Sequence, residues 1–313
     1  MPPKLTRIRR AESPRPAMLA VAGDSAAGKT TVTRGLAEAL GEDRSTSVCV
    51  DGYHRHDRRE RRGPPVTPLH PACEHAGTME RDLRLLAMGR PIPAPACGHR
   101  DGPPAGSRLI EPRDLVIVEG LLPFRTRPAR ACFDVTVYLD PPEPVRLGWK
   151  AARDAGRRGR TRERVLAGIA GREADSAVLV RPQRQEADIV VRFEPAGGRG
   201  EAPLSVTLLL RPTVRHPDLA RILAGTTGSA ARLVPARDCD GTPVDALHVD
   251  GEADPLEADA VARAIWYDLG VPEPLPGCLG RMPGGSRNEP LRITQLVLLH
   301  HLIRAGVWRV PGE

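Results

Sequence analysis

Residues 23–30 of this chain read Gly23-Asp24-Ser25-Ala26-Ala27-Gly28-Lys29-Thr30. The stretch fits the phosphate-binding pattern G-x-x-x-x-G-K-[ST], in which glycines let backbone N–H groups turn toward phosphate oxygens. A short apolar run at residues 18–22 (MLAVA) precedes it, and an amphipathic segment at residues 31–40 (TVTRGLAEAL) follows it. The run predicts a buried strand and the segment predicts a helix. Together they predict a nucleoside-triphosphate site, with a chance glycine-rich turn as the alternative.

Two side chains of this loop have a predicted chemical role. Lys29 can reach the β- and γ-phosphates, and the hydroxyl group of Thr30 can ligate Mg²⁺. The N-terminus of the helix that follows adds partial positive charge. The expected cofactors are therefore a nucleoside triphosphate and Mg²⁺. The residues predicted to bind the nucleotide are Gly23, Asp24, Ser25, Ala26, Ala27, Gly28, Lys29, Thr30 and Thr31.

The composition of the chain limits its class. Its 313 residues leave room for one large domain and a smaller one. No run approaches the ~20 consecutive apolar residues of a membrane span, so we expect a soluble protein with no membrane partner. The six cysteines are scattered without a C-x-x-C pair, which favours a reducing cytoplasm over a zinc site or a disulfide framework.

The net charge of +7 fits either nucleic acid or a phosphorylated small substrate. The chain holds only three Phe, three Tyr and three Trp residues. Because single-stranded nucleic acid is bound largely by stacking on aromatic rings, this scarcity argues against it. We therefore expect a small-molecule substrate and no nucleic-acid partner.

Acidic residues end two further predicted strands. Residues 47–50 (SVCV) end at Asp51, and residues 115–118 (LVIV) end at Glu119. Parallel α/β sheets gather ligands at the carboxyl ends of their strands. Asp51 could there accept a proton from a hydroxyl group that attacks the γ-phosphate, and Glu119 could hold Mg²⁺. An ordinary helix-capping role is the alternative for Asp51.

Residues 143–155 predict a helix, and an arginine-rich stretch follows it. Such a density of positive charge predicts a lid that closes over the triphosphate. A solvated basic helix and a nucleic-acid patch are the alternatives. The basic residues between positions 146 and 172, in the helix and after it, are Arg146, Lys150, Arg153, Arg157, Arg158, Arg160, Arg162, Arg164 and Arg172.

The remaining elements complete an α/β pattern. Helices are expected at residues 79–88, 257–269 and 290–305, the last with a wide apolar face that suits core packing or a dimer contact. Further strands are expected at 135–139, 187–193, 204–210, 232–234 and 246–249, and an irregular excursion or a β-hairpin at 89–113.

The predicted fold is a three-layer α/β sandwich of the P-loop type with a parallel central sheet, plus a smaller C-terminal α/β region. Residues 1–16, with five basic side chains, predict a disordered basic arm, with an organelle transit peptide as the alternative. Residues 17–194 form the expected P-loop domain. Residues 195–202 form a linker, and residues 203–313 form the smaller region.

Several segments in this order resemble the phosphoribulokinase/uridine kinase family of P-loop kinases, over about residues 18–193. The segments are GDSAAGKT, VCVDGYHRHDRRERR, TPLHP, VIVEGLLPF, VYLDPPEPVRLGWKAARDAGRRGRT and RPQRQEADIVV. The resemblance implies ATP-dependent phosphorylation of the 1-hydroxyl group of D-ribulose 5-phosphate, in the Calvin cycle, by a homo-oligomer. A kinase for uridine or another small metabolite, and a degenerate ATP-binding regulatory protein, are the alternatives.

The resemblance also implies roles for individual residues. Asp51 would be the general base, with Lys150, Arg153 and Asp154 as further catalytic residues. Several arginines suit a substrate that already carries a phosphate. The implied substrate-binding residues are His54, Arg58, Arg61, His99, Arg158 and Arg172. The chain departs from the family pattern on the sugar side, at residues 74–77 and at Cys97.

Overall fold

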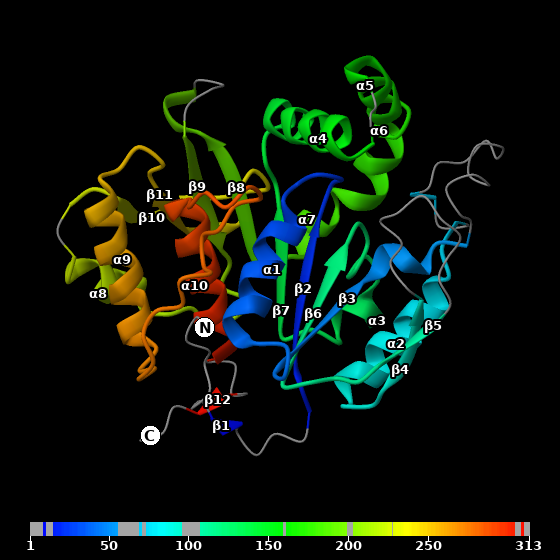
Figure 1. Cartoon of the computed structure of the whole chain (residues 1–313), viewed down its shortest axis with the longest axis horizontal. Coiled ribbons are helices and arrows are strands. Elements are labelled where there is room, and N and C mark those ends of the chain that lie inside the picture. Colours follow the sequence, from blue (N-terminus) through cyan, green and yellow to red (C-terminus); the bar gives the residue numbers. More distant parts are fainter. Residues whose placement is uncertain are drawn as a thin grey trace.

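The computed structural model describes residues 9–10, 15–55, 69–70, 73–95, 107–158, 161–198, 203–226, 228–303 and 308–309. At its centre lies an eight-stranded sheet in the order β10-β11-β9-β8-β7-β2-β6-β3 (Figure 1). The predicted Arg58, Arg61 and His99 lie outside the described residues, as does the side chain of Arg158.

Five strands of this sheet are parallel, as the sequence predicts. They are β2 (Ala17–Gly23), β3 (Ser45–Cys49), β6 (Leu115–Gly120), β7 (Val135–Leu139) and β8 (Ile189–Pro195). Every residue of β2 is buried, because helices cover both faces of a parallel sheet. The carboxyl ends of β2, β3 and β6 therefore meet at one edge of the sheet.

Alternate residues of β2 pack into different layers. Leu19 and Val21 belong to the hydrophobic core that also holds buried residues of α1 (Lys29–Leu40), α9 (Pro255–Asp268) and α10 (Glu289–Leu302). Met18 belongs to the core of the opposite face, with α2 (Ala76–Ala87) and α3 (Arg127–Arg130). Ala20 and Ala22 also pack on that face, beside α7 (Gln183–Glu186). The three-layer α/β sandwich is thus confirmed.

The C-terminal region continues the same sheet with antiparallel strands. These are β9 (Leu204–Leu210), β10 (Ala231–Arg237) and β11 (Pro243–Val249), with the short helix α8 (Leu219–Ala224) between β9 and β10. Strand β9 pairs with β8 along its whole length. At the start of the expected linker, β8 runs to Pro195 and the short turn η5 (Ala196–Gly198) follows, while residues 199–202 lie outside the described residues.

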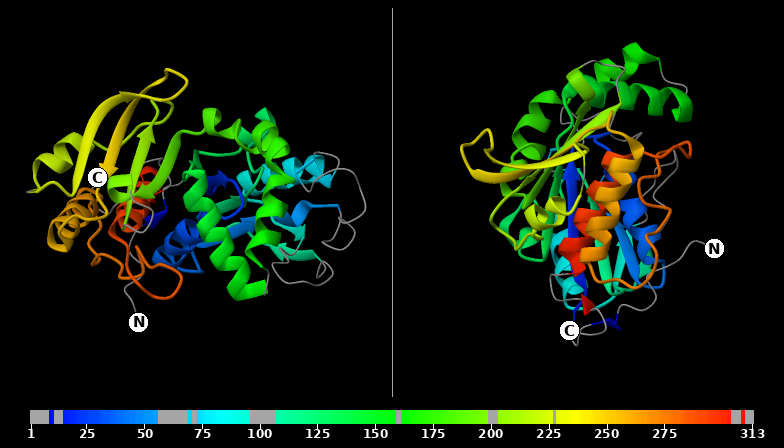
Figure 2. Two further views of the ribbon diagram at one scale, coloured as in Figure 1. Left: turned by 90° about the horizontal axis from the view of Figure 1, so that it is seen from above. Right: turned by 90° about the vertical axis from the view of Figure 1, so that its left-hand side faces the viewer.

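Helix α10 explains the wide apolar face seen in the sequence. Figure 2 shows α9 and α10 side by side against the C-terminal strands, and α10 also packs on α1. Every α10 residue from Pro290 to Leu302 is buried within the single chain. Core packing therefore accounts for this face without a dimer contact.

Helices stand above the carboxyl edge of the parallel strands (Figure 1). They are α4 (Glu143–Arg158), α5 (Arg162–Ala170), α6 (Glu173–Asp175) and the π-helical turn η4 (Ser176–Val180). Another short turn, η1 (Val50–Tyr53), follows β3 at the same edge. The segment predicted as a lid thus lies directly over the phosphate-binding loop.

Two peripheral pairs of strands complete the fold. Strands β4 (Ile92–Pro95) and β5 (Ser107–Ile110) pair antiparallel, which is the hairpin expected as one option for residues 89–113. Within the arm predicted to be disordered, β1 (Arg9–Arg10) pairs with β12 (Trp308–Arg309), and residues 1–8 and 11–14 of that arm lie outside the described residues.

None of the helices that the structure describes combines the length and the hydropathy needed to cross a bilayer.

Candidate active site

The phosphate-binding loop connects β2 to α1 as predicted. Gly28 caps α1 with a positive φ of 96°, and Gly23 has a φ of 146°, a conformation that side chains disfavour. A Cβ atom at Gly23 would also lie 2.7 Å from the backbone oxygen of Leu139. The Nζ atom of Lys29 donates to the backbone oxygens of Gly23 (2.8 Å) and Asp24 (3.0 Å). The ammonium group therefore lies over the loop, where phosphates would bind.

The two predicted metal ligands lie together. The hydroxyl group of Thr30 donates to both carboxylate oxygens of Glu119, at 3.1 and 3.2 Å. Thr33, one turn further along α1, approaches the same carboxylate at 3.4 Å. Hydroxyl and carboxylate oxygens are the hard ligands that Mg²⁺ prefers. The donor set therefore fits a magnesium ion shared by the loop and the end of β6.

Asp51 lies at the same edge, in the turn η1 after β3. Its Oδ1 atom accepts a hydrogen bond from the backbone N–H of Leu121 at 2.9 Å. The close approach of the turn η1 to the end of β6 requires a glycine at position 120, because a Cβ atom there would lie 2.3 Å from Val50 Cγ2 and 2.9 Å from Asp51 Oδ1. Asp51 is thus held beside the end of the strand that carries Glu119.

Helix α4 contributes the predicted basic and acidic side chains. Lys150 is 7% exposed, and Asp154 is 2% exposed. Arg153 Nε donates to Asp154 Oδ1 at 3.0 Å. Burial and then the charges of Arg172, Arg153 and Arg146 together lower the pKa of Lys150 to about 8, while Asp154 opposes the shift. The structure therefore brings Lys150, Arg153, Asp154 and Arg172 into one cluster of charges.

Trp149 joins this helix to the phosphate-binding loop. A Cβ atom at Gly28 would lie 3.7 Å from Trp149 Cζ3, and the indole ring packs edge-on against Phe193 with 6.4 Å between ring centroids. Helix α4 is thereby fixed against both the loop and β8. Its charges consequently lie at a set distance from the loop.

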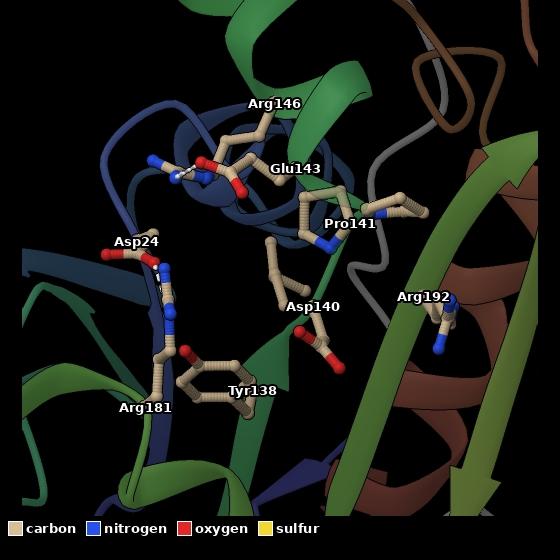
Figure 3. Close-up of a pocket in the computed structure, with 10 residues that line it drawn as sticks. Asp24, Tyr138, Asp140, Pro141, Glu143, Arg146, Arg181 and Arg192 are labelled. Atoms are coloured by element: carbon tan, nitrogen blue, oxygen red, sulfur yellow. Dashed lines mark ion pairs between the residues drawn. The ribbon is translucent and has the colours of Figure 1, made fainter. Parts of the chain in front are cut away.

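Asp24 has a structural role within the loop. Figure 3 shows its carboxylate directed at Arg181, whose Nε atom lies 3.5 Å from Asp24 Oδ2. The hydroxyl group of Ser176 also donates to Asp24. These contacts border a pocket of about 200 Å³, which Tyr138 and Asp140 help to line. The side chain of this predicted nucleotide-binding residue thus ties the loop to the segment that follows α6.

A larger cavity of about 470 Å³ lies on the other side of the loop. It is enclosed by α1, β3 and the β4–β5 hairpin, and it reaches Thr30, Thr33 and Glu119. Arg34 and Arg108 also line it. There is consequently free space next to the pair of predicted metal ligands.

Sequence reasoning assigned no role in the site to Glu74. Its backbone forms an isolated antiparallel bridge with His54. Of the predicted substrate-binding residues, the structure describes the side chains of His54 and Arg172. The carboxyl group is buried, and burial followed by the charge of Asp51 raises its pKa to about 7, against the effect of Arg125. A charged residue in a proline-containing loop gives no periodic signal. In the sequence, only its departure from the family pattern distinguishes this residue.

Comparison with known proteins agrees with this geometry. Residues 18–196 match the model of the phosphoribulokinase / uridine kinase family. The chain belongs to this family. It is 37% identical to a phosphoribulokinase of Synechocystis sp. over 178 residues, or 57% of this chain and 54% of that protein. It is 30% identical to the chloroplastic phosphoribulokinase of Triticum aestivum over 197 residues, or 58% of this chain and 49% of that protein.

Solved structures extend the likeness in fold beyond the family segment. The phosphoribulokinase from Rhodobacter spheroides superposes with a TM-score of 0.60 at 14% identity, over 94% of this chain and 99% of the other. In sequence, the chain matches only about half the length of the curated family members named above. The family segment ends where the antiparallel part of the sheet begins.

Proposed function

We propose that this protein is an ATP-dependent kinase that phosphorylates the 1-hydroxyl group of D-ribulose 5-phosphate to ribulose 1,5-bisphosphate. The observation that carries the proposal is the meeting of Asp51 with the Thr30–Glu119 pair at the carboxyl ends of adjacent strands. Relatives named phosphoribulokinase in two organisms support the choice of substrate. A cytoplasmic location and a homo-oligomeric state stay predictions of the same reading.

The chain's own residues suit each requirement of phosphoryl transfer. Asp51 accepts the proton of the acceptor hydroxyl group. At the same time the hydroxyl oxygen bonds to the γ-phosphorus, and the bond between that phosphorus and the β–γ bridging oxygen breaks. Lys29 and the loop N–H groups hold the phosphates of ATP. Lys150 and Arg153 stabilise the charge on the phosphoryl group in transit.

Thr30 and Glu119 would hold Mg²⁺, which when bound neutralises charge on the β- and γ-phosphates. Arg172 lies in the same charged cluster as Lys150, and we assign it to the phosphate groups. His54, Arg58, Arg61, His99 and Arg158 remain the proposed ligands of the sugar phosphate.

The test is ADP release from MgATP in a coupled assay, with ribulose 5-phosphate, uridine, cytidine or no acceptor. Turnover with ribulose 5-phosphate alone is the expected result. Turnover with uridine alone would favour the uridine branch of the family. ATP binding without turnover on any acceptor would favour the regulatory alternative.

Asp51→Asn provides the matched control for the assay. This variant keeps the shape of the side chain but lacks a base, so we expect its kcat to fall by about 10²–10⁴ while ATP binding is unchanged. Retention of most of the kcat would remove Asp51 from the role of general base.

A further inference from the structure

Glu74 carries a buried carboxyl oxygen that the described chain leaves without a partner. The residue is 6% exposed, and its Oε2 atom has no hydrogen bond among the described residues. Buried polar atoms in folded proteins are almost always hydrogen-bonded, and an exception calls for an explanation. A ligand that supplies the missing partner is one such explanation.

The backbone around Glu74 is fastened to the segment that follows Asp51. The N–H of Arg55 donates to the backbone oxygen of Cys73 at 2.8 Å, and the N–H of His75 donates to that of Tyr53 at 2.9 Å. These bonds flank the bridge between His54 and Glu74. The position of Glu74 is therefore set by the same turn that sets the position of Asp51.

A second contact fixes this turn from the side of α2. The hydroxyl group of Tyr53 donates to Asp82 Oδ2 at 2.9 Å, and both residues are buried. Movement of the turn would break this bond as well as the bridge. The backbone bonds between the two segments and the bond from Tyr53 to Asp82 thus hold Glu74 near Asp51.

The surroundings of Glu74 favour its neutral form at pH values up to about 7. Burial and the charge of Asp51 raise the pKa of the Glu74 carboxyl group to about 7, and Arg125 is the cation that opposes them. Two nearby carboxyl groups rarely ionise together, because the second charge is repelled by the first. A neutral carboxyl group donates one hydrogen bond and accepts others. It therefore suits an uncharged oxygen of a ligand.

We propose that Glu74 is a specificity-determining residue of the acceptor site, and that its carboxyl group hydrogen-bonds an acceptor oxygen adjacent to the hydroxyl group that Asp51 deprotonates. The inference rests on the proposed kinase function. It names the class of acceptor as a sugar phosphate with two neighbouring oxygens, such as a hydroxyketone or a vicinal diol. An acceptor without the second oxygen leaves Glu74 unpaired, and sites built around a buried polar group reject such analogues.

The experiment compares ribulose 5-phosphate with 2-deoxyribitol 5-phosphate, which keeps the 1-hydroxyl group and lacks an oxygen at carbon 2. We expect the parent chain to prefer ribulose 5-phosphate, and Glu74→Ala to reduce the ratio of the two kcat/KM values at least ten-fold. The KM for ATP should not change. Glu80→Gln is the matched control, because Glu80 accepts a hydrogen bond from Thr126 and should leave the ratio as it is. An unchanged ratio in Glu74→Ala overturns the proposal.

Glu74→Gln adds a readout that a purely structural role would not move. The amide cannot ionise, so the limb of the kcat/KM profile near pH 7 should disappear in this variant while ribulose 5-phosphate is still turned over. Persistence of that limb would assign it to another group and overturn the pairing with Asp51.

The melting temperature without substrate separates failure of this inference from failure of the proposed function. A ligand-binding carboxyl group that lacks a partner in the free protein does not stabilise it, so Glu74→Gln should melt at the same temperature as the parent or higher. A lower melting temperature would show a structural role and overturn the inference, even if the parent turned over none of the acceptors. If the parent turns over none of the acceptors, the proposed function fails. An unchanged or higher melting temperature of Glu74→Gln would still support Glu74 as a ligand-binding group.

Discussion

Lys150 links the charge of a single residue to turnover. Burial of its ammonium group, followed by the charges of the arginines around it, lowers its pKa to about 8. Because the charged form is the one that stabilises the phosphoryl group, we predict that kcat/KM falls as the pH rises through about 8. Arginine stays charged at this pH, so Lys150→Arg should lose that limb of the profile, whatever its effect on the maximum rate. The measurement is kcat/KM for ATP between pH 6 and 9.5. The same limb in both proteins would assign it to a different group.

At the scale of the elements, Gln295 joins the C-terminal helix α10 to the P-loop helix α1. The side chain is fully buried, and its Nε2 atom donates to the backbone oxygens of Thr31 (3.3 Å) and Val32 (3.0 Å). Its Oε1 atom accepts from the N–H of Gly280 at 2.8 Å. A Cβ atom at Gly35 would lie 2.1 Å from Gln295 Nε2. The contact between the two helices therefore depends on a glycine in the middle of α1.

We predict that Gly35→Ala lowers the free energy of unfolding by about 1–3 kcal/mol, since overpacking outweighs the ~1 kcal/mol that alanine contributes inside a helix. Gly168→Ala on α5 is the matched control. A Cβ atom there meets nothing within 4 Å, so that variant should be unchanged or slightly more stable. Urea denaturation gives both values. Equal effects at the two positions would contradict the close contact at Gly35.

Helix α10 also carries a histidine whose ionisation opposes folding. His301 is buried, its Nδ1 atom contacts the backbone oxygen of Val297 at 2.7 Å, and its Nε2 atom contacts His216 at 2.7 Å. Burial lowers the pKa of His301 to about 4, and His216 and His300 add to the shift while the Val297 contact opposes it. Between about pH 6.5 and 4, this histidine is therefore protonated in the unfolded chain and neutral in the folded chain.

Stability should accordingly fall as the pH drops through this window, by about 2 kcal/mol at pH 5 for this group alone. The measurement is the free energy of unfolding in urea at pH 7.5 and pH 5.0, for the parent and for His301→Gln. The parent should lose more stability than the variant on acidification. An equal loss would mean that other groups carry the acid sensitivity.

Periodicity predicted most of these elements, and local contacts decided the rest. The strands β2, β6 and β7 and the helix α1 carry apolar patterns long enough to be read directly. The four-residue helix α3 and the π-helical turn η4 are too short for a period. The pairing of Thr30 with Glu119 was predictable because both follow parallel strands at one edge of the sheet. Glu74 was not, because its burial depends on a bridge to His54, twenty positions earlier in the chain.

At the scale of the whole molecule, a buried network of charges connects the parallel and antiparallel parts of the sheet. Arg184 of α7 donates to Asp140 after β7 (2.7 Å) and to Asp238 after β10 (2.7 Å). Arg211, after β9, donates to the same Asp238 at 2.5 Å. Burial opposes the ionisation of Asp238, but the hydrogen bonds from the two arginines outweigh it and hold the pKa below its usual range. Removal of one arginine would leave the buried carboxylate of Asp238 incompletely compensated.

This network and the pairing of β8 with β9 predict that the chain unfolds as one cooperative unit. Trp149 on α4 and Trp266 on α9 can report on the two parts separately, since the third tryptophan, Trp308, lies in β12. Fluorescence of Trp266→Phe/Trp308→Phe follows the first part, and fluorescence of Trp149→Phe/Trp308→Phe follows the second. Each midpoint in urea should coincide with the midpoint from far-UV circular dichroism of the same variant.

Separate midpoints would mean that the antiparallel strands unfold independently of the parallel strands, although the two parts share one hydrogen-bonded sheet. Coincident midpoints would mean that α10 and β9 stabilise the phosphate-binding loop through α1 and β8. In that case a substitution at the contact between α1 and α10, such as Gly35→Ala, should lower the urea midpoint reported by both tryptophans equally. The cooperativity of the sheet would then set how firmly the loop that binds phosphate is held.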